Sequence, residues 1–284
     1  HLRPRRQRQM CIRDRVSITS RKSQTTRNNI LGIKTKDNHQ MVFIDTPGVH
    51  INASKVMNKV LNQSALGAIE DADLIIFMLQ RNKINTLDEL ILERLKGVET
   101  KKICVINKLD QVASINSLLP VVEKLRSEND FAEIIPVSAK TGKNINELEN
   151  MICQNLPENN HLYDSETKFL AKKSFMISEI IREKIIRFLG EELPHETYVQ
   201  LQKLEDKENI INIDAEIIVA RESQKGIVVG KNGAKLKKIG EKARIDLEKF
   251  FNKKVFLKTW VKTKKNWNND SDFISSLGIG SLYD

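Results

Sequence analysis

Three short polar motifs follow apolar runs in the first half of the chain, and their residue types suit nucleotide chemistry. The first, Asp45-Thr46-Pro47-Gly48, follows the apolar run that ends at Ile44. A carboxylate at Asp45 can hold a magnesium ion through water, and the Gly48 amide can approach a terminal phosphate closely because glycine has no side chain. Alone, the motif is more often an ordinary proline turn than a functional site.

The second motif, Asn107-Lys108-Leu109-Asp110, contains a carboxylate that can discriminate between purine bases. Asp110 can accept two hydrogen bonds, from the ring N–H and the exocyclic amine of guanine. Adenine has no such pair of donors, so a site built around Asp110 would select guanine. The alternative is a charged loop after a strand.

The third motif is Ser138-Ala139-Lys140. The backbone N–H of Ala139 can meet the carbonyl oxygen of guanine, and Lys140 can cover the base. This motif is weak alone. The order of the three motifs, each at the end of an apolar run, favours a guanine nucleotide site over chance.

The segments that must position these motifs alternate between strand and helix. We expect strands at 41–44, 74–79, 103–106 and 134–137, and helices at 53–70, 87–96, 116–128 and 145–152. Such alternation predicts a parallel sheet covered by helices on both faces. Ligands of open α/β sheets bind beyond the carboxyl ends of the strands, which is where the three motifs lie.

A polar linker at 157–172 leads to a second pattern in the order α-β-β-α-α-β. We expect a helix at 173–189 ended by Gly190, strands at 197–204 and 210–220, helices at 224–229 and 234–250, and a strand at 254–262. Gly230-Lys231-Asn232-Gly233 lies between the last two helices. KH domains use such a GxxG loop to bring backbone against single-stranded RNA. The alternative for GxxG alone is a tight turn.

A basic segment surrounds this loop. Residues 221–265 contain fifteen Lys/Arg and four Asp/Glu, which accounts for essentially the whole net charge of +10. Such a patch suits a polyanion, with nucleic acid first and anionic lipid second, although a solvated lysine-rich surface is the alternative. The residues that we expect to contact RNA are Ile227, Val228, Gly230, Lys231, Asn232, Gly233, Lys235, Lys237 and Lys238.

Composition excludes several protein classes. Hydrophobic residues make up 40% and charged residues 30%, which is typical of a globular protein. The three cysteines form no CxxC pair, so they indicate neither a zinc site nor a disulfide framework, and a reducing compartment fits. No apolar run approaches the roughly 18 residues of a membrane span, and the beginning of the chain has no secretory signal.

The motifs resemble those of the Era family of bacterial ribosome-assembly GTPases. DTPG, NKLD and SAK match its G domain, and Ser17 to Arg27 is similar to its switch I region. Ser178 to Lys184 and Trp260-Val261-Lys262 match its second domain. The resemblance implies an α/β P-loop-NTPase-like G domain at 16–156, incomplete at its N-terminus. A type II KH domain of the α+β class follows at 173–265, with a tail at 266–284.

The resemblance also implies activity, ligands and partners. It implies binding of GTP or GDP with Mg²⁺ held through Thr26 and Asp45, and hydrolysis of GTP to GDP and phosphate. Val49 stands where Ras-like GTPases carry the glutamine that orients water, so we identify no catalytic residue and expect slow unaided hydrolysis. The implied partners are small-subunit ribosomal RNA and the small ribosomal subunit, whose maturation it assists. We expect a cytoplasmic monomer loosely associated with the anionic inner membrane.

The sequence contains no GxxxxGK[ST] phosphate-binding loop before the switch I-like segment. An arginine-rich stretch at 1–15 occupies that place, and the composition changes abruptly at Val16. We therefore favour a spurious start that replaces the true first strand, loop and helix. A divergent chain that has lost phosphate binding and a basic RNA-binding arm are the alternatives.

Three rival functions fit parts of the pattern. One is a nucleotide-independent KH module with a defective G domain, for which the absent phosphate loop is the evidence. A second is the family of ribosome GTPases with two G domains, against which the single NKLD and the intact GxxG argue. A third is a membrane-surface protein that uses the lysine patch.

Overall fold

The structure, a computed structural model, describes residues 30–49, 55–80, 83–189 and 196–279. The expectations for residues 1–15, for Thr26 in the switch I-like segment and for Gly190 lie outside these ranges. The chain forms two compact units. The first, the parallel-sheet unit, comprises residues 35–41 and 66–164. The second comprises the described parts of 1–34, 42–65 and 165–284, and we call it the KH unit because it contains the segment expected to form a KH domain. The domain boundaries expected from the sequence remain predictions.

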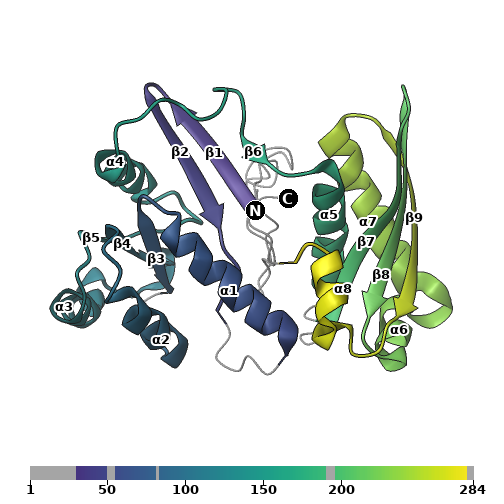
Figure 1. The fold of residues 1–284 in the computed structure, drawn as a ribbon, viewed down its shortest axis with the longest axis horizontal. Coiled ribbons are helices and arrows are strands. Elements are labelled where there is room, and N and C mark those ends of the chain that lie inside the picture. Colours follow the sequence, from purple (N-terminus) through teal and green to yellow (C-terminus); the bar gives the residue numbers. More distant parts are fainter. Residues whose placement is uncertain (1–29, 50–54, 81–82, 190–195, 280–284) are drawn as a thin grey trace, which may run out of the picture. The chain divides into compact units, whose positions relative to one another are not determined.

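The parallel-sheet unit is built on three of the four strands that were expected to form it. β3 (Ile75–Gln80), β4 (Lys102–Asn107) and β5 (Glu133–Pro136) are parallel, with β4 in the middle (Figure 1). The first five residues of β4 are buried. Its near-continuous apolar sequence suits a central strand covered on both faces. The register pairs Gln80 with Asn107 and Ile106 with Pro136, so the carboxyl ends of the strands meet at one edge.

Helices cover both faces of this sheet, which confirms the expectation. They are α2 (Thr86–Leu95), α3 (Leu119–Glu128) and α4 (Ile145–Asn155). Cys104 and Ile106 pack in a core with residues of α2 and α3. Ile103 and Val105, on the opposite face of β4, pack with residues of α4. A short 3-10 helix, Ile115–Leu118, precedes α3 where one continuous helix was expected.

A buried lysine joins α2 to the sheet. The Nζ of Lys102 donates to the carbonyl of Leu95 at 3.2 Å, at the C-terminal end of α2 where carbonyls lack partners within the helix. The same Nζ lies 2.8 Å from Asp130 Oδ2. The hydrogen bond from Lys102 holds the pKa of Asp130 below its usual value. Lys102 thus supports packing within the unit.

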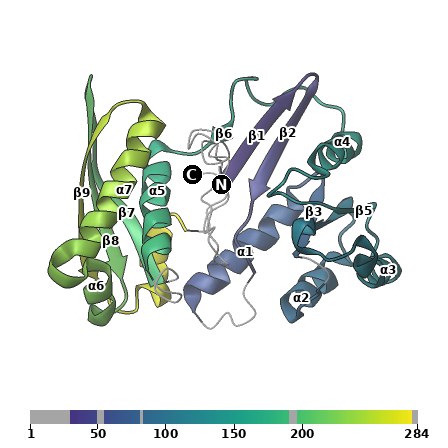
Figure 2. The same ribbon diagram turned by 180° about the vertical axis from the view of Figure 1, so that it is seen from behind.

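The KH unit contains the expected α-β-β-α-α-β order. Its elements are α5 (Lys173–Phe188), β7 (Thr197–Asp206), β8 (Ile210–Val219), α6 (Glu222–Val229), α7 (Ala234–Phe251) and β9 (Lys254–Thr263). β8 lies in the middle, antiparallel to β7 and parallel to β9. The strands lie in front of α7 in Figure 1 and behind it in Figure 2, so the helices share one face of the sheet. Alternate residues of β8, including Ile211, Ile213 and Ile217, fill the core beneath them.

Two strands, β1 (Ile30–Lys36) and β6 (Phe169–Leu170), were not expected from the sequence. β1 and β2 (His39–Asp45) form a hairpin whose turn has Asp37 at a φ of 52°. The short β6 lies within the expected linker, and Leu170 pairs with Leu31 of β1. The expected strand at 41–44 is confirmed as part of β2, but its place in the parallel sheet is corrected. β2 pairs with β1 in a separate sheet, in the order β2-β1-β6.

The segment after β9 is folded, although the sequence suggested only a polar tail. It contains a 3-10 helix, Trp267–Asn269, and α8 (Ser271–Ser276). Trp267 is 0% exposed and packs with Ile274 in a core that also contains Met57 and Leu61 of α1 (Val56–Glu70). No helix in the described part of the chain is both long and apolar enough to cross a membrane.

Candidate functional site

The structure brings the second and third motifs together at the carboxyl edge of the parallel sheet. Asn107 ends β4, and Lys108 then turns the backbone with a φ of 66°. The amide of Leu109 donates to the carbonyl of Val137 at 3.0 Å, which ties the two loops to each other. Six expected site residues thereby become neighbours: Asn107, Lys108, Asp110, Ser138, Ala139 and Lys140.

The side chain of Asn107 has a defined orientation. Its Oδ1 accepts from the backbone amide of Lys108 at 2.7 Å and from that of Ala139 at 3.1 Å. Two donors on one oxygen fix which side-chain atom is the oxygen. The Nδ2 lies 3.8 Å from the sulfur of Met78, a weak acceptor, and can therefore donate to an acceptor on a purine ring. We expected the Ala139 amide to donate to the guanine carbonyl. In this structure it donates to Asn107 Oδ1.

Asp110 is oriented by Ser138 and charged at neutral pH. The buried Ser138 hydroxyl donates to Asp110 Oδ1 at 2.7 Å, and Lys140 Nζ lies 3.8 Å from Asp110 Oδ2. The Ser138 hydrogen bond is the main cause that lowers the pKa of Asp110, and Lys140 adds to the effect. The Ser138 Oγ also accepts from the amide of Thr141 at 3.2 Å, which holds the hydroxyl in place. The fixed, ionised carboxylate matches a pair of N–H donors.

Asn144 is a supporting residue that the sequence analysis missed. Its Nδ2 donates to the carbonyl of Pro136 at 2.8 Å, and its backbone has a φ of 60°. It thereby holds the loop after Ser138 against the end of β5. Asparagine before a helix is a common signal for such a role, because it tolerates the left-handed conformation.

The first motif is described separately, because residues 42–65 cluster with the second compact unit rather than with the parallel sheet. Asp45 ends β2, Thr46 and Gly48 are exposed, and Pro47 is buried. Val49 is half-buried. Exposed Gly48 leaves its backbone accessible, and the polar residues present fit a Mg²⁺-bound phosphate in chemical type. Thr26, the other expected Mg²⁺ ligand, lies outside the described residues.

The GKNG loop requires its glycines. Gly230 ends α6 with a φ of 71°, and Gly233 precedes α7 with a φ of 75°. A Cβ on Gly230 would lie 2.7 Å from the Cβ of Lys235, so any side chain there would displace the beginning of α7. Lys231 and Asn232 between them are exposed. No side chain caps the N-terminus of α7, which leaves backbone amides facing outward next to two exposed polar residues.

An open groove of about 440 Å³ begins at this loop. It runs between α7 and β9 and is lined by Gly233, Leu236, Lys237, Gly240, Glu241, Arg244, Leu257 and Thr259. Lys235 is half-buried beside Gly230, whereas Lys238 lies 5.4 Å from the ring centroid of Phe188, on the side of α7 that packs toward α5. The groove combines backbone, apolar and cationic groups, as single-stranded RNA requires.

Val228 does not lie on this surface. It is 0% exposed and belongs to the core of the KH unit, whereas its neighbour Ile227 is 44% exposed. Consecutive residues of a helix point in different directions, so Ile227, Val228 and Val229 of α6 cannot all lie on one surface. Val228 is the one that points into the core. The expectation that Val228 contacts RNA is therefore corrected, and its role is packing.

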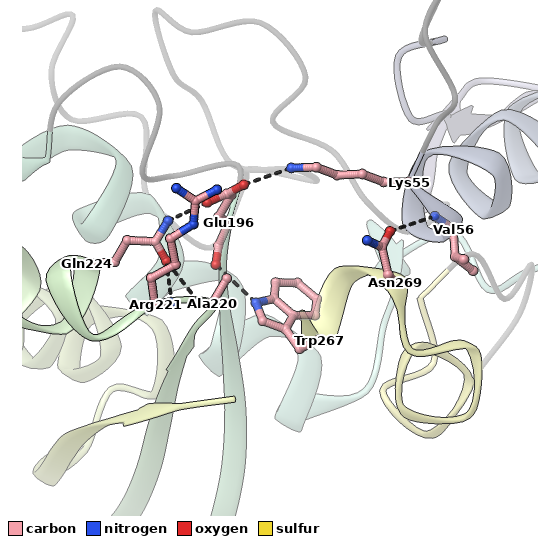
Figure 3. Close-up of polar contacts among 8 residues, drawn as sticks. All are labelled: Lys55, Val56, Glu196, Ala220, Arg221, Gln224, Trp267 and Asn269. Carbon is pink, nitrogen blue, oxygen red and sulfur yellow. Dashed lines mark hydrogen bonds and ion pairs between the residues drawn. The ribbon is translucent and has the colours of Figure 1, made fainter. Parts of the chain in front are cut away.

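A hydrogen-bond network joins the beginning of α1 to the beginning of α6 (Figure 3). Lys55 donates to Glu196 Oε1 at 2.7 Å, and Gln224 donates from Nε2 to Glu196 Oε2. The Oε1 of Gln224 accepts the amides of Ala220 and Arg221 at 2.9 and 3.0 Å. Lys55 lies seven residues after Gly48 in the sequence, and α6 leads into the GKNG loop. The network therefore connects the segment after DTPG with the element that carries GxxG.

The sequence signal for this network was partial. Gln224 follows Arg221 by three residues, the spacing at which a glutamine side chain reaches back to the beginning of a helix. Nothing in the local sequence indicates the contact of Glu196 with Lys55, which lies 141 positions away. Asn269 adds a second link, because its Oδ1 accepts the amide of Val56 at 3.3 Å, at the N-terminus of α1.

We expect Glu196→Gln to destabilise the protein by about 1–2 kcal/mol near neutral pH, since a charged hydrogen-bond partner becomes neutral. Burial alone would raise the pKa of Glu196, but Lys55 and Gln224 together lower it. The carboxylate therefore contributes stability above the unfolded pKa of about 4.3, and this is lost as pH falls through the lower folded pKa. Denaturant unfolding at several pH values tests this.

The exposed Glu208 provides the control for that measurement. Glu208→Gln should leave the midpoint of unfolding unchanged within about 0.5 kcal/mol at every pH. If Glu196→Gln lowers the free energy of unfolding by the same amount at low pH as at neutral pH, the ionised carboxylate does not have the role given to it.

Comparisons with known proteins cover both halves of the chain. Residues 9–108 match the model of the family described as 50S ribosome-binding GTPase, and residues 192–268 match that of the KH domain. GTPase Era of Coxiella burnetii (strain Dugway 5J108-111) is 44% identical over 265 residues, which cover 93% of this chain and 90% of the relative. GTPase Era of Pseudomonas syringae pv. tomato is 40% identical over 268 residues, covering 94% and 89%.

Two solved structures have the same fold over most of the chain. One is a variant of Aquifex aeolicus Era bound to GDP·AlF4⁻, with a TM-score of 0.88. The other is Era in complex with MgGDPNP and nucleotides 1506–1542 of 16S ribosomal RNA, with a TM-score of 0.89. Each is 33% identical to this chain, and each match covers 93% of this chain and 90% of the other. Together with the G-domain motifs and the GKNG loop, these matches establish that the chain belongs to the Era GTPase family.

Proposed function

We propose that this protein binds and hydrolyses GTP, binds small-subunit ribosomal RNA and assists assembly of the small ribosomal subunit. The observation that carries the proposal is the presence of two sites on one chain. One is the purine-selective edge formed by Asn107, Asp110 and Ser138, and the other is the GKNG loop with its groove. The Era structures bound to nucleotide and to 16S ribosomal RNA support the same pairing.

The residues of the parallel-sheet edge recognise the base in this proposal. Asn107 donates from Nδ2 to a ring nitrogen, and Asp110 accepts from the two N–H groups of guanine. Ser138 keeps the Asp110 carboxylate oriented, and Lys140 moves away from Asp110 to lie over the base. Thr46 and Gly48 contact the phosphates, while Asp45 and Thr26 hold Mg²⁺, which neutralises phosphate charge when bound. Val49 cannot orient water, so hydrolysis is slow without a partner.

The network of Figure 3 suggests how the two sites communicate. Thr46 and Gly48 contact the phosphates in this proposal, and Lys55, seven residues after Gly48, donates to Glu196. Glu196 in turn positions Gln224 and the beginning of α6. A change of the nucleotide that moves Gly48 and, through the chain, Lys55 would alter these contacts and so the presentation of the GKNG loop. RNA affinity that is the same with GDP and GTP would contradict this coupling.

The protein acts in the cytoplasm as a monomer in this proposal, with a peripheral contact to the anionic inner membrane through its lysines. A nucleotide-independent KH module is not favoured, because the similarity to curated GTPases extends over both units. Titration with anionic vesicles in competition with RNA tests the membrane contact, and sedimentation tests the monomer.

We expect the double substitution Lys231→Asp and Asn232→Asp to weaken RNA binding by at least about 10-fold. It replaces an exposed cation and amide with two anions where a phosphate would lie, and each lost charge contact costs roughly 1 kcal/mol or more. Fluorescence anisotropy with a labelled single-stranded RNA measures the effect.

The matched control for the loop variant is Lys143→Asp with Asn144 unchanged. Lys143 is an exposed lysine in a loop beside Gly142, which also has positive φ. Its substitution changes the net charge of the protein without touching the KH unit. Equal weakening by the control would mean that overall charge, rather than the GKNG loop, determines RNA affinity.

A further inference from the structure

The outer face of the KH sheet carries a row of alternating lysine and aromatic side chains on β9. We name it the β9 stripe, and it consists of Lys254, Phe256, Lys258, Trp260 and Lys262. These residues alternate with Val255, Leu257 and Val261, which pack into the core beneath the helices. Period-two alternation places the stripe on the opposite face of the sheet.

The stripe is exposed at its centre. Phe256 is 59% exposed, which is unusual for a phenylalanine in a regular strand. The ammonium of Lys258 lies 5.9 Å from the ring centroid of Trp260, and Trp260 donates from Nε1 to Glu216 at 2.9 Å. The Trp260 ring is thereby fixed in orientation. An exposed ring, a fixed ring and interleaved cations form a platform of the kind on which unpaired bases stack.

Two acidic residues of β8, Asp214 and Glu216, lie beside the stripe. Glu216 accepts from Trp260, and Lys262 lies 3.6 Å from its other oxygen. Asp214 is paired in register with Lys258 on one side and Lys203 on the other. The three stripe lysines outnumber these two carboxylates, so the stripe keeps a net positive charge that favours an anionic ligand.

The position of β9 connects the stripe with the groove at the GKNG loop. Leu257 and Thr259 line that groove from the inner side of β9, while Phe256 and Lys258 face outward from the same stretch of strand. β9 is an edge strand of this sheet among the described residues. A chain that lies in the groove can therefore pass around the free edge of β9 and reach Phe256 with no intervening element of the sheet.

We propose that the β9 stripe is a second contact surface for single-stranded RNA, which continues from the groove around the edge of β9 and stacks bases on Phe256 and Trp260. The inference rests on the proposed RNA-binding function of the GKNG loop and extends its footprint. The loop and groove hold about four nucleotides, as in other KH domains. The stripe contacts the nucleotides beyond them.

RNA length separates the two contributions. The probes are labelled, unstructured single strands of A and C with about four and about 12 nucleotides, which fill the groove alone or the groove and the stripe. The test variant is Phe256→Ala with Lys258→Ala. The matched control is Leu204→Ala with Lys203→Ala on β7, which removes one exposed apolar side chain and one lysine from the opposite edge of the same sheet.

The stripe variant is expected to bind the long RNA roughly 5- to 150-fold more weakly than the unchanged protein, the range that corresponds to one lost stacking platform. It should bind the short RNA unchanged, and the control variant should match the unchanged protein at both lengths. The Lys231→Asp and Asn232→Asp protein should lose affinity for both RNAs, which shows that the groove is the primary site.

Three results would overturn the inference. If the stripe and control variants bind the long RNA equally well, the stripe is no RNA surface, although the loop's function stands. If the stripe variant instead loses affinity for phosphatidylglycerol vesicles and keeps its RNA affinity, the stripe contacts lipid. If the unchanged protein binds neither RNA, the proposed function of the loop fails as well. Circular dichroism of each variant establishes that it is folded.

Discussion

Asp110→Asn is expected to weaken GDP binding at least 100-fold and to favour xanthosine diphosphate. Two charge-assisted hydrogen bonds of about 1.5–3 kcal/mol each depend on the carboxylate. The Ser138 hydroxyl, 2.7 Å from Oδ1, still finds an oxygen there, so the new amide takes the place of Oδ2. That amide is a donor, so it faces the donors of guanine without forming a hydrogen bond. It can donate to the carbonyl that xanthine carries in place of the exocyclic amine. Titration with fluorescent GDP, XDP and ADP in the presence of Mg²⁺ measures the change.

Asp130→Asn is the control for this substitution. Asp130 also has a lowered pKa, but Lys102 is its partner and it takes no part in the strand-end edge. Its variant should keep the preference for GDP over ADP. A failure of the unchanged protein to bind GDP would mean that the pocket does not act without a phosphate-binding loop. An equal loss of GDP affinity in both variants would indicate unfolding rather than a loss of base recognition.

The meeting of the second and third motifs was predictable because strand ends are local features, whereas the strand before the first motif joined a different sheet. An apolar run followed by polar residues identifies the end of a buried strand, and parallel strands bring such ends to one edge. The structure accordingly places Asn107, Asp110 and Ser138 together. The sequence could not show that Asn107 Oδ1 accepts the amide of Ala139, because that contact depends on how two loops meet 32 positions apart.

The elements that were missed depend on distant partners. Leu170 becomes part of a strand only because it pairs with Leu31, and two residues of β6 carry no periodic signal. In α6, an apolar run of three residues does not reveal which one points inward, so Val228 was assigned to the surface although it is buried. The segment after Asn266 was described as polar, yet its few apolar residues fill a core that α1 and β8 complete.

The role of that segment follows from Trp267, whose replacement is expected to have the largest effect on stability. Trp267→Ala should destabilise the KH unit by about 3–5 kcal/mol. The side chain is 0% exposed, contacts the rings of Tyr198 and Phe273, and donates from Nε1 to the carbonyl of Glu196 at 3.1 Å. Its removal leaves a cavity and takes away a hydrogen bond from a residue of the network in Figure 3. Urea unfolding followed by circular dichroism gives the free energy.

The other tryptophan of the chain is the control. Trp260 is half-buried on the outer face of the sheet, so Trp260→Ala should lower the free energy of unfolding by less than about 1.5 kcal/mol. The stability of Trp267→Phe should fall between those of the two alanine variants, because it keeps most of the packing and loses the N–H.

Since Glu196 connects Trp267 with Gln224 and α6, the Trp267 variants should also weaken RNA binding at low temperature, where they are still folded. A cost for Trp267→Ala no larger than that for Trp260→Ala would show that the segment after β9 is a tail after all.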